Sequence, residues 1–317
     1  MKNFKFTLLA LFFICLFQMS CEDEYQASTQ SDLLISKIPV ESGMYSFVDE
    51  SQFREVIKDY YKNSKAYKSF FIKTGFQSYL VQKEKLISVD RSNKTYEELV
   101  ALIKEYKLFI NNQNEVSMPF EFSYQNALYN LEGKVKINNE INQLASVDFN
   151  SFQERNQNAS CHTDYDYDKG AWCADRRLKG TISSEFGGTN PTLEAQFGEC
   201  FVDYIIESKT NYFVRQAGIW WWNSASTLET RSEHEFFINR KIPSGTNNVK
   251  TILYDWANDD HEIVAGTILH VSQSSSGGCV TQNSTNHGIV TASSEHYGND
   301  SDNCGIKNKT IYISVCN

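Results

Sequence analysis

The chain has 317 residues, of which 39 are Asp or Glu and 30 are Lys or Arg, so its formal net charge is −9. The sequence contains no basic cluster and no basic helical pattern, which argues against a nucleic-acid partner and against charge-driven binding to anionic lipid. The length allows one large domain or two of ordinary size.

The N-terminus has the layout of a secretory signal. Lys2 and Lys5 precede an almost unbroken apolar run from Phe6 to Phe17. A basic start ahead of a short apolar stretch is typical of a signal peptide, and this stretch is too short to span a bilayer. We therefore predict that residues 1–20 are a signal peptide.

The residues that follow predict a lipid anchor. The pair Ser20-Cys21 resembles the end of the lipobox of bacterial lipoproteins. This resemblance implies that Cys21 becomes the new N-terminus and carries lipid, so that the membrane is a partner through the anchor. The run Glu22-Asp23-Glu24 resembles the export signal of Bacteroidetes-type lipoproteins, which implies the outer face of the outer membrane. Residues 21–37 are predicted to be the lipidated cysteine and a flexible tether. An ordinary secreted protein is the alternative.

Residues 38–150 are predicted to form a small α/β module. Asp49 and Gln52 are spaced to cap a helix. Its apolar residues recur at helical spacing, namely Phe53, Val56, Ile57, Tyr60 and Tyr61. Thr95 and Glu98 form a capping-box pair ahead of a second helix. The apolar face of that helix is predicted to consist of Leu99, Leu102, Ile103, Tyr106 and Ile110.

A third short helix from Tyr124 to Leu131 and a hairpin turning at Asn138-Asn139 complete this module. The run NALYNLEGKVKINNEI, which ends at Ile141, resembles a recurrent element of uncharacterised Bacteroidetes-type surface lipoproteins. The run GMYSFVDESQFREVI, which begins at Gly43, resembles their strand–helix start, although the family more often has glycine at the hairpin turn. The resemblance implies a domain of unknown function ahead of an extracellular β-domain, and it transfers no catalytic residue.

Residues 151–317 have β patterns separated by turn-rich segments. The predicted strands are Leu178–Ser184, Leu193–Phe201, Tyr212–Trp221, Thr227–Ile238, Val249–Trp256, Ile263–Val271, Gly288–Ser293 and Thr310–Val315. The predicted fold class is therefore α+β, with a small helical N-terminal module followed by an antiparallel β-sandwich of jelly-roll or Ig-like type. A barrel is the alternative.

Six cysteines lie in this second half. Because an even number of cysteines in an exported protein favours disulfides, we predict that they brace the β-domain. Sequence alone does not choose the pairing, although Cys161–Cys173 is a plausible local bridge and another could secure the C-terminal strand. A zinc site is the weaker interpretation, since no Cys-x-x-Cys pair occurs. The six are Cys161, Cys173, Cys200, Cys279, Cys304 and Cys316.

A calcium site is one interpretation of four aspartates. Asp164, Asp166, Asp168 and Asp175 occupy relative positions 1, 3, 5 and 12, the ligand spacing of a calcium loop. Lys169 takes the place of the usual glycine at position 6, and the last position has Asp in place of Glu. The alternative is a hairpin or loop whose aspartates face solvent and whose tyrosines face inward.

The run Trp220-Trp221-Trp222 is a candidate ligand-binding surface. On a strand, Trp220 and Trp222 face one way and Trp221 the other, and an exposed aromatic platform stacks on sugar rings or packs at an interface. The alternative is that these side chains pack in the core of the β-domain.

No catalytic residue is assigned, because the sequence contains no nucleophile elbow, metal-binding His pair or phosphate-binding glycine loop. We therefore expect a non-enzymatic surface lipoprotein that binds a glycan or another protein. A secreted hydrolase acting on polysaccharide or peptide, and a structural component of a surface assembly, are the two alternatives. Calcium is the one cofactor considered, and no nucleic-acid partner is expected.

Overall fold

The computed structural model describes residues 32–144, 160–167, 175–198, 200–237, 248–273, 289–299 and 307–316. Residues 1–20 and Cys21, predicted to be the signal peptide and anchor, lie outside the described residues. The N-terminal part contains η1 (Leu34–Lys37), β1 (Val40–Glu41), β2 (Met44–Phe47), α2 (Glu50–Lys62), α3 (Ser64–Thr74), α4 (Tyr79–Ile87), α5 (Tyr96–Glu105), β3 (Phe109–Ile110), β4 (Val116–Ser117), α6 (Ser123–Leu128), β5 (Lys134–Ile137) and β6 (Glu140–Gln143).

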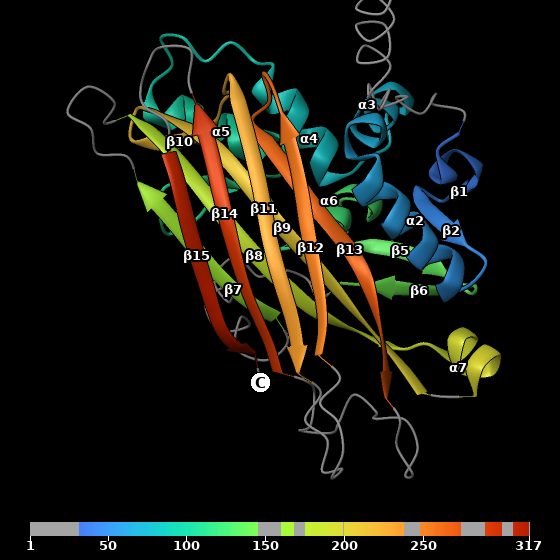
Figure 1. The fold of residues 1–317 in the computed structure, drawn as a ribbon. Coiled ribbons are helices and arrows are strands. Elements are labelled where there is room, and N and C mark those ends of the chain that lie inside the picture. The colour runs from blue at the N-terminus through green and yellow to red at the C-terminus, as the bar shows by residue number, and fades with distance from the viewer. Residues whose placement is uncertain are drawn as a thin grey trace, which may run out of the picture.

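The second part is mostly β-structure. It contains β7 (Ser160–Tyr167), β8 (Arg176–Thr189), α7 (Pro191–Phe197), β9 (Cys200–Gln216), β10 (Ile219–Trp222), β11 (Thr227–Phe237), β12 (Asn248–Ala257), β13 (Glu262–Gln273), β14 (Ile289–Asn299) and β15 (Lys307–Cys316). In Figure 1, helices α3, α4 and α5 lie near the upper end of the long strands, α2 and α6 lie beside their middle, and α7 lies near their lower end. The protein is therefore α+β and rich in strands.

The two predicted helix starts are confirmed. The Asp49 side chain accepts a hydrogen bond from the backbone N–H of Gln52 at 2.8 Å and caps α2. The five apolar residues predicted for that helix are all buried. The Thr95 hydroxyl accepts from Glu98 N at 3.3 Å, while the Glu98 carboxylate accepts from Thr95 N at 2.7 Å, which is a complete capping box.

The N-terminal sheet has the order β1-β2-β5-β6, in which β2 and β5 are parallel. Asn138 and Asn139 have φ values of 52° and 62°, so the β5–β6 hairpin turns at the two predicted residues. The second helix is shorter than predicted, because α5 ends at Glu105 and Ile110 belongs to β3 instead of to its apolar face. Helices α3 and α4 were not predicted.

The second part folds into two antiparallel sheets. In one, the strands are ordered β10-β9-β8-β7 and β13 also pairs with β9; in the other, the order is β12-β11-β14-β15. The sheets contact each other face to face. The Ser208 hydroxyl of β9 is 2.7 Å from that of Thr230 in β11, and the Thr210 hydroxyl of β9 is 2.7 Å from His296 Nδ1 in β14.

The strand predicted over Leu193–Phe201 is wrong. The segment forms α7 instead, because Asn190 caps it by accepting from Leu193 N at 3.1 Å, Pro191 occupies the first turn, and Gly198 ends it at a φ of 69°. The next strand, β9, runs unbroken for 17 residues through the stretch between two predicted strands. Residues 202–208 are buried on both faces, so no polar alternation marks them.

The two halves of the chain share their hydrophobic cores. One buried cluster joins Tyr61 of α2 and Val135 of β5 to Ile205 of β9 and Ile268 of β13. A second joins Leu86, Leu99 and Ile103 of the N-terminal helices to β10. The N-terminal elements therefore pack directly on the sheet formed by β9, β10 and β13.

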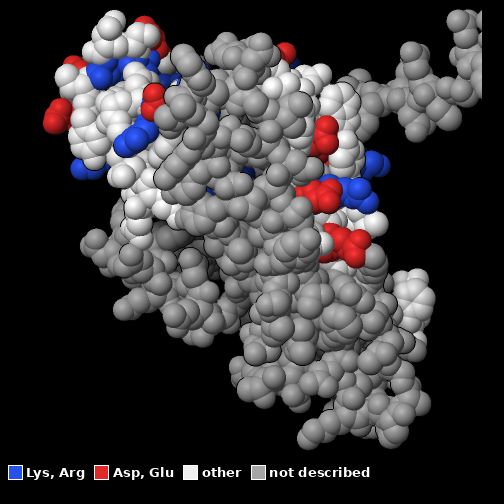
Figure 2. All heavy atoms as spheres, turned by 60° about the vertical axis from the view of Figure 1, so that its left-hand side comes forward, with Lys and Arg blue, Asp and Glu red and all other residues white. Residues whose placement is uncertain are grey.

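On the face drawn in Figure 2, the described acidic and basic side chains are interspersed and do not separate into regions of one sign. Among the described residues, none of the helices has the length and apolar character needed to cross a membrane.

Candidate functional site

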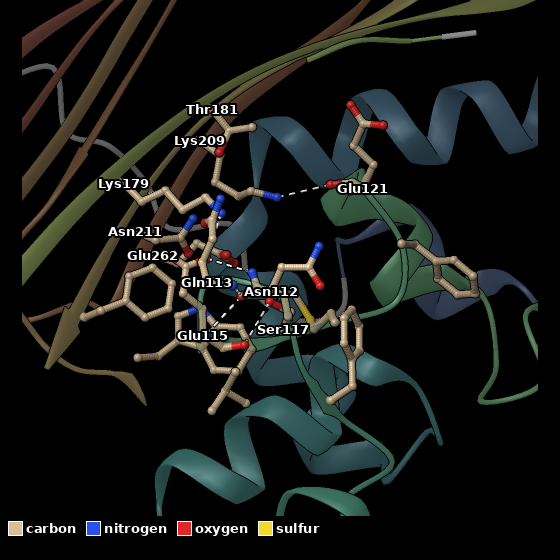
Figure 3. Close-up of a pocket in the computed structure, with 17 residues that line it drawn as sticks. Asn112, Gln113, Glu115, Ser117, Glu121, Lys179, Thr181, Lys209, Asn211 and Glu262 are labelled. Atoms are coloured by element: carbon tan, nitrogen blue, oxygen red, sulfur yellow. Dashed lines mark hydrogen bonds and ion pairs between the residues drawn. The ribbon is translucent and has the colours of Figure 1, made fainter. Parts of the chain in front are cut away.

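A cavity of about 330 Å³ lies between the β3–β4 hairpin and one face of the sheet formed by β8, β9 and β13 (Figure 3). Ligand pockets occupy roughly 300–1,000 Å³, so this cavity has the size of a small ligand site. Its lining combines amides, charged groups and aromatic rings. The lining residues are Phe109, Asn111, Asn112, Gln113, Glu115, Val116, Ser117, Met118, Phe120, Glu121, Lys179, Thr181, Lys209, Asn211, Phe213, Trp222 and Glu262.

The floor of the cavity is a row of polar side chains across three strands. Asn211 of β9 is directly opposite Lys179 of β8 on one side and opposite Glu262 of β13 on the other. Side chains at directly opposed positions point to the same face and lie about 4.5–5.5 Å apart at Cβ. The register therefore aligns a cation, an amide and a carboxylate, as Figure 3 shows.

The opposite wall is the tight hairpin from Asn111 to Glu115. The Asn111 side-chain oxygen accepts from Gln113 N at 2.9 Å and from Glu115 N at 3.0 Å, while Asn114 adopts a φ of 59°. Asparagine favours such turns because its short side chain bonds to nearby backbone and tolerates positive φ. Trp220 N donates to Asn114 O at 2.7 Å, so the hairpin is also fixed to β10.

Glu115 holds the hairpin to the sheet. Its side chain is 1% exposed and pairs with Arg177 and, at 2.9 Å, with Lys179, both of β8. The Asn111 amide donates to it at 2.8 Å. Burial by itself raises the pKa of the Glu115 carboxyl, but Lys179, Asn111 and Arg177 together hold that pKa below its ordinary value. Glu115 therefore remains ionised.

Lys209 lies beside a second set of carboxylates. Its ammonium donates to the carbonyl of Glu121 at 3.1 Å and is 3.4 Å from the Glu207 carboxylate. Burial lowers the pKa of Lys209, but Glu207 and Glu262 raise it above its usual value, so the ammonium keeps its charge. Burial raises the pKa of Glu207, whereas Lys83, at 2.6 Å, and Lys209 hold that of Glu262 below its ordinary range despite burial.

Two side-chain amide oxygens in this lining have no hydrogen-bond partner among the described residues. The Oδ1 atom of Asn211 and the Oε1 atom of Gln113 are buried and accept no hydrogen bond from the described part of the chain. Asn211 is 4% exposed. Because an unpaired buried oxygen costs about 1–3 kcal/mol, these two atoms mark where a donor from outside the chain would bind.

The three predicted tryptophans do not form an exposed platform. Trp220, Trp221 and Trp222 are 7%, 1% and 4% exposed, and they pack in a cluster with the N-terminal helices. The three tryptophans are therefore packed in the core, which was the alternative to an exposed platform. Trp222 also lines the cavity, next to Phe213. The centroids of the two stacked rings are 6.1 Å apart, and the angle between the ring planes is 28°.

The aspartates of the calcium hypothesis are only partly described. Asp164 and Asp166 belong to strand β7, opposite Thr181 and Leu178, with a register irregularity between them. Their side chains and all of Asp168 lie outside the description. Asp175 is exposed, and its carbonyl accepts from Arg215 N at 2.9 Å. Within the described ranges, no group of three or more His, Cys, Asp and Glu residues is arranged to hold a metal ion.

The disulfide prediction also falls largely outside the described residues. Cys161 lies in β7, Cys200 begins β9 and Cys316 ends β15, but their side chains are not described. Cys173, Cys279 and Cys304 lie in undescribed segments. The pairing therefore stays a prediction.

Sequence reasoning did not find the cavity. The polar run Asn111-Asn112-Gln113-Asn114 is the signal that could have drawn attention to it, since four adjacent amides rarely serve a core. Glu115, which follows this run, pairs with Arg177 and Lys179 of β8, which lie 62 and 64 residues away in the sequence. Only the fold brings these groups together.

Comparison with known proteins adds little. No family model matches the chain, and no curated protein matches it. Among solved structures, the chain is similar to a DUF4848 family protein from Bacteroides thetaiotaomicron, with 13% sequence identity, 87% of this chain and 100% of that chain covered, and a TM-score of 0.29. A TM-score this low carries no argument about fold or function.

Proposed function

We propose that this chain is a binding protein that takes a small polar ligand, a glycan fragment or a peptide group, in the cavity beneath the β3–β4 hairpin. The observation that carries the proposal is that the buried Oδ1 of Asn211, on the floor of the cavity, and Gln113 Oε1 in the same lining accept no hydrogen bond from the described residues. A bound donor group would satisfy both oxygens.

The scaffold suits a preorganised site. We propose that the two facing sheets form a β-sandwich, in keeping with the hydrogen bonds between β9 and β11 and between β9 and β14. The second sheet then packs against the back of the strands that carry the floor residues of the cavity. Rigid support of this kind limits the ordering cost of binding.

We also propose that the protein is exported and anchored by lipid on Cys21, at the outer face of the outer membrane. Support comes from the signal-like residues 1–20 and from the acidic run Glu22-Asp23-Glu24. Protease added to intact cells would then digest the protein. In a Cys21→Ser variant the protein would leave the membrane fraction, and retention of that variant in the membrane would contradict the anchor.

The binding proposal is tested with the purified full-length protein and a panel of small saccharides and peptides. A ligand at 100 times its Kd should stabilise the fold by about 2.7 kcal/mol in thermal or denaturant unfolding. Ser117→Trp, which places a large ring in the cavity, should abolish that stabilisation. Ser69→Trp, on the exposed surface of α3, is the matched control. Stabilisation that survives Ser117→Trp would place the ligand elsewhere.

A further inference from the structure

We propose that the ligand of this cavity is a neutral saccharide unit of one or two rings, with Asn211 and Gln113 as the residues that recognise its hydroxyls. This inference rests on the binding function proposed above and narrows it to one ligand class. Four properties of the cavity lead to it: its size, its mixture of donors and acceptors, the pairing of its charges, and its aromatic wall.

The size excludes a long occupant. At about 330 Å³ the cavity lies at the lower end of the range for ligand pockets. One or two sugar rings would fit, whereas an extended chain would have to continue outside the cavity. The ligand is therefore a single unit or the end of a longer chain.

The polar groups need a partner that both donates and accepts. Asn211 Oδ1 and Gln113 Oε1 are acceptors that lack a donor among the described residues. The ammonium groups of Lys179 and Lys209 in the same lining can only donate. A hydroxyl group acts as both donor and acceptor, and adjacent hydroxyls on one ring can satisfy both kinds of protein group.

Four of the five charged side chains in the lining are paired within the protein, namely Glu115, Lys179, Lys209 and Glu262, and this pairing favours a neutral ligand. Lys179 is 2.9 Å from Glu115, and Lys209 lies between the carbonyl of Glu121 and the carboxylate of Glu207. Glu262 is 2.6 Å from Lys83. A carboxylate or ammonium ligand would have to compete with these internal pairs and lose its own hydration as well. A neutral ligand competes with none of these pairs, and it loses less hydration free energy than an ion does.

The aromatic wall completes the match. Phe109, Phe120, Phe213 and Trp222 line the cavity together with the polar row of Asn211. A sugar ring has C–H groups on its faces and hydroxyls around its edge, so it presents apolar and polar surfaces at once. Aromatic surface removes the C–H groups from water while the amides bond to the hydroxyls.

The test is a calorimetric binding panel on the full-length protein. The panel contains neutral hexoses and pentoses with their disaccharides, uronic acids, sugars with a free amine, and dipeptides. We expect binding of at least one neutral sugar, with a Kd that changes less than about twofold between 0.1 and 1 M salt, because screening does not weaken contacts to an uncharged ligand. Binding confined to uronic acids, amino sugars or dipeptides would overturn the inference and leave the binding function standing. No binding by any class would overturn both.

Variants of the recognition residues separate ligand contact from structural support. Asn211→Ala and Gln113→Ala should each weaken binding of the neutral sugar about tenfold, the value of one hydrogen bond near the upper end of its usual range. Each should cost the free protein less stability than Glu115→Ala does, since the lost oxygen accepts no hydrogen bond from the described residues. Asn223→Ala is the control, because Asn223 does not line the cavity and its side-chain amide donates to the neighbouring Ser224 carbonyl at 3.2 Å. Unchanged affinity in both recognition variants would contradict the proposal.

Discussion

The two faces of strand β9 are both buried but differ in chemistry. Toward the N-terminal elements, β9 presents Glu207, Lys209 and Asn211 next to a cavity. Toward the other sheet it presents Ser208 and Thr210, which hydrogen-bond to Thr230 and His296. One face thus carries charges held in pairs, and the other carries a neutral network of hydroxyls and imidazoles.

The difference identifies which face has room for a ligand. Between the sheets, His296 hydrogen-bonds through Nδ1 to Thr210 and through Nε2 to Ser294 at 2.6 Å, so both ring nitrogens have a partner. Gly180 lies so close to that ring that an added Cβ would force the ring or the strand to shift. On the cavity face, by contrast, amide oxygens remain without partners among the described residues. Tight packing therefore supports the fold on the face of β9 toward the other sheet, and incomplete packing leaves a site on the cavity face.

The largest expected effect comes from breaking the charge pairs on the cavity face. Glu115→Ala should lower the free energy of unfolding by about 3–5 kcal/mol, because it leaves Arg177 buried without its carboxylate partner. Urea unfolding measures the change. Glu132→Ala is the matched control, since its pair with Lys134 lies on the surface, and it should have no measurable effect. Equal effects for the two variants would show that Glu115 does not anchor the hairpin.

A methyl group added between the sheets should have the next largest effect. The Cβ of Gly180→Ala would overlap the imidazole ring of His296, so the ring or the strand must shift. Overpacking of this kind costs about 1–3 kcal/mol. Gly187→Ala, where the nearest atom to an added Cβ is 3.4 Å away and φ is not positive, controls for the loss of glycine itself. A neutral Gly180→Ala would mean that the two sheets pack less closely than the structure shows.

The two faces should respond to pH in opposite directions. Burial lowers the pKa of His234 to about 4 and of His296 to about 3. Their contribution to stability is complete above about pH 6.5 and is lost as pH falls toward these values, by up to about 1.4 kcal/mol per pH unit for each histidine.

Glu185, which contacts Tyr124 and Gln125 of α6, acts in the opposite sense. Burial and the nearby Glu121 raise its pKa to about 7, so its contribution is complete below pH 4.5 and is lost as pH rises toward 7. Denaturant unfolding between pH 4.5 and 8 measures both effects. His234→Leu should reduce the loss of stability on acidification, and Glu185→Gln should raise stability at pH 8. Identical pH profiles for wild type and either variant would contradict the assignment.

The smallest effect is expected away from both faces. Trp256 of β12 is 52% exposed, and Trp256→Ser should change the free energy of unfolding by no more than about 0.5 kcal/mol. Trp221→Ala, at a residue 1% exposed, should cost about 3–5 kcal/mol in the same measurement. A large effect of Trp256→Ser would reveal a stabilising contact outside the described residues.

The accuracy of the sequence predictions follows the range of the interactions involved. The caps at Asp49 and Thr95 and the turn at Asn138-Asn139 were predictable because each depends on contacts within four residues. The segment at Leu193 was misassigned because its apolar residues suggested a strand, whereas the Asn190 cap and Pro191 favoured a helix. For the tryptophans, an exposed platform and packing in the core were both open, and the N-terminal helices that cover them decide for the core.

The sequence by itself determined the α+β class, the main helix starts and the hairpin turn, since local hydrogen bonds and the periodicity of apolar residues decide these features. Only the tertiary structure decided the course of β9 and the site beside it. A strand buried on both faces shows no alternation, and the cavity joins a hairpin at Asn111–Glu115 to strand residues as distant as Glu262. Cross-strand register places Asn211 between Lys179 and Glu262, and no spacing along the chain encodes that row.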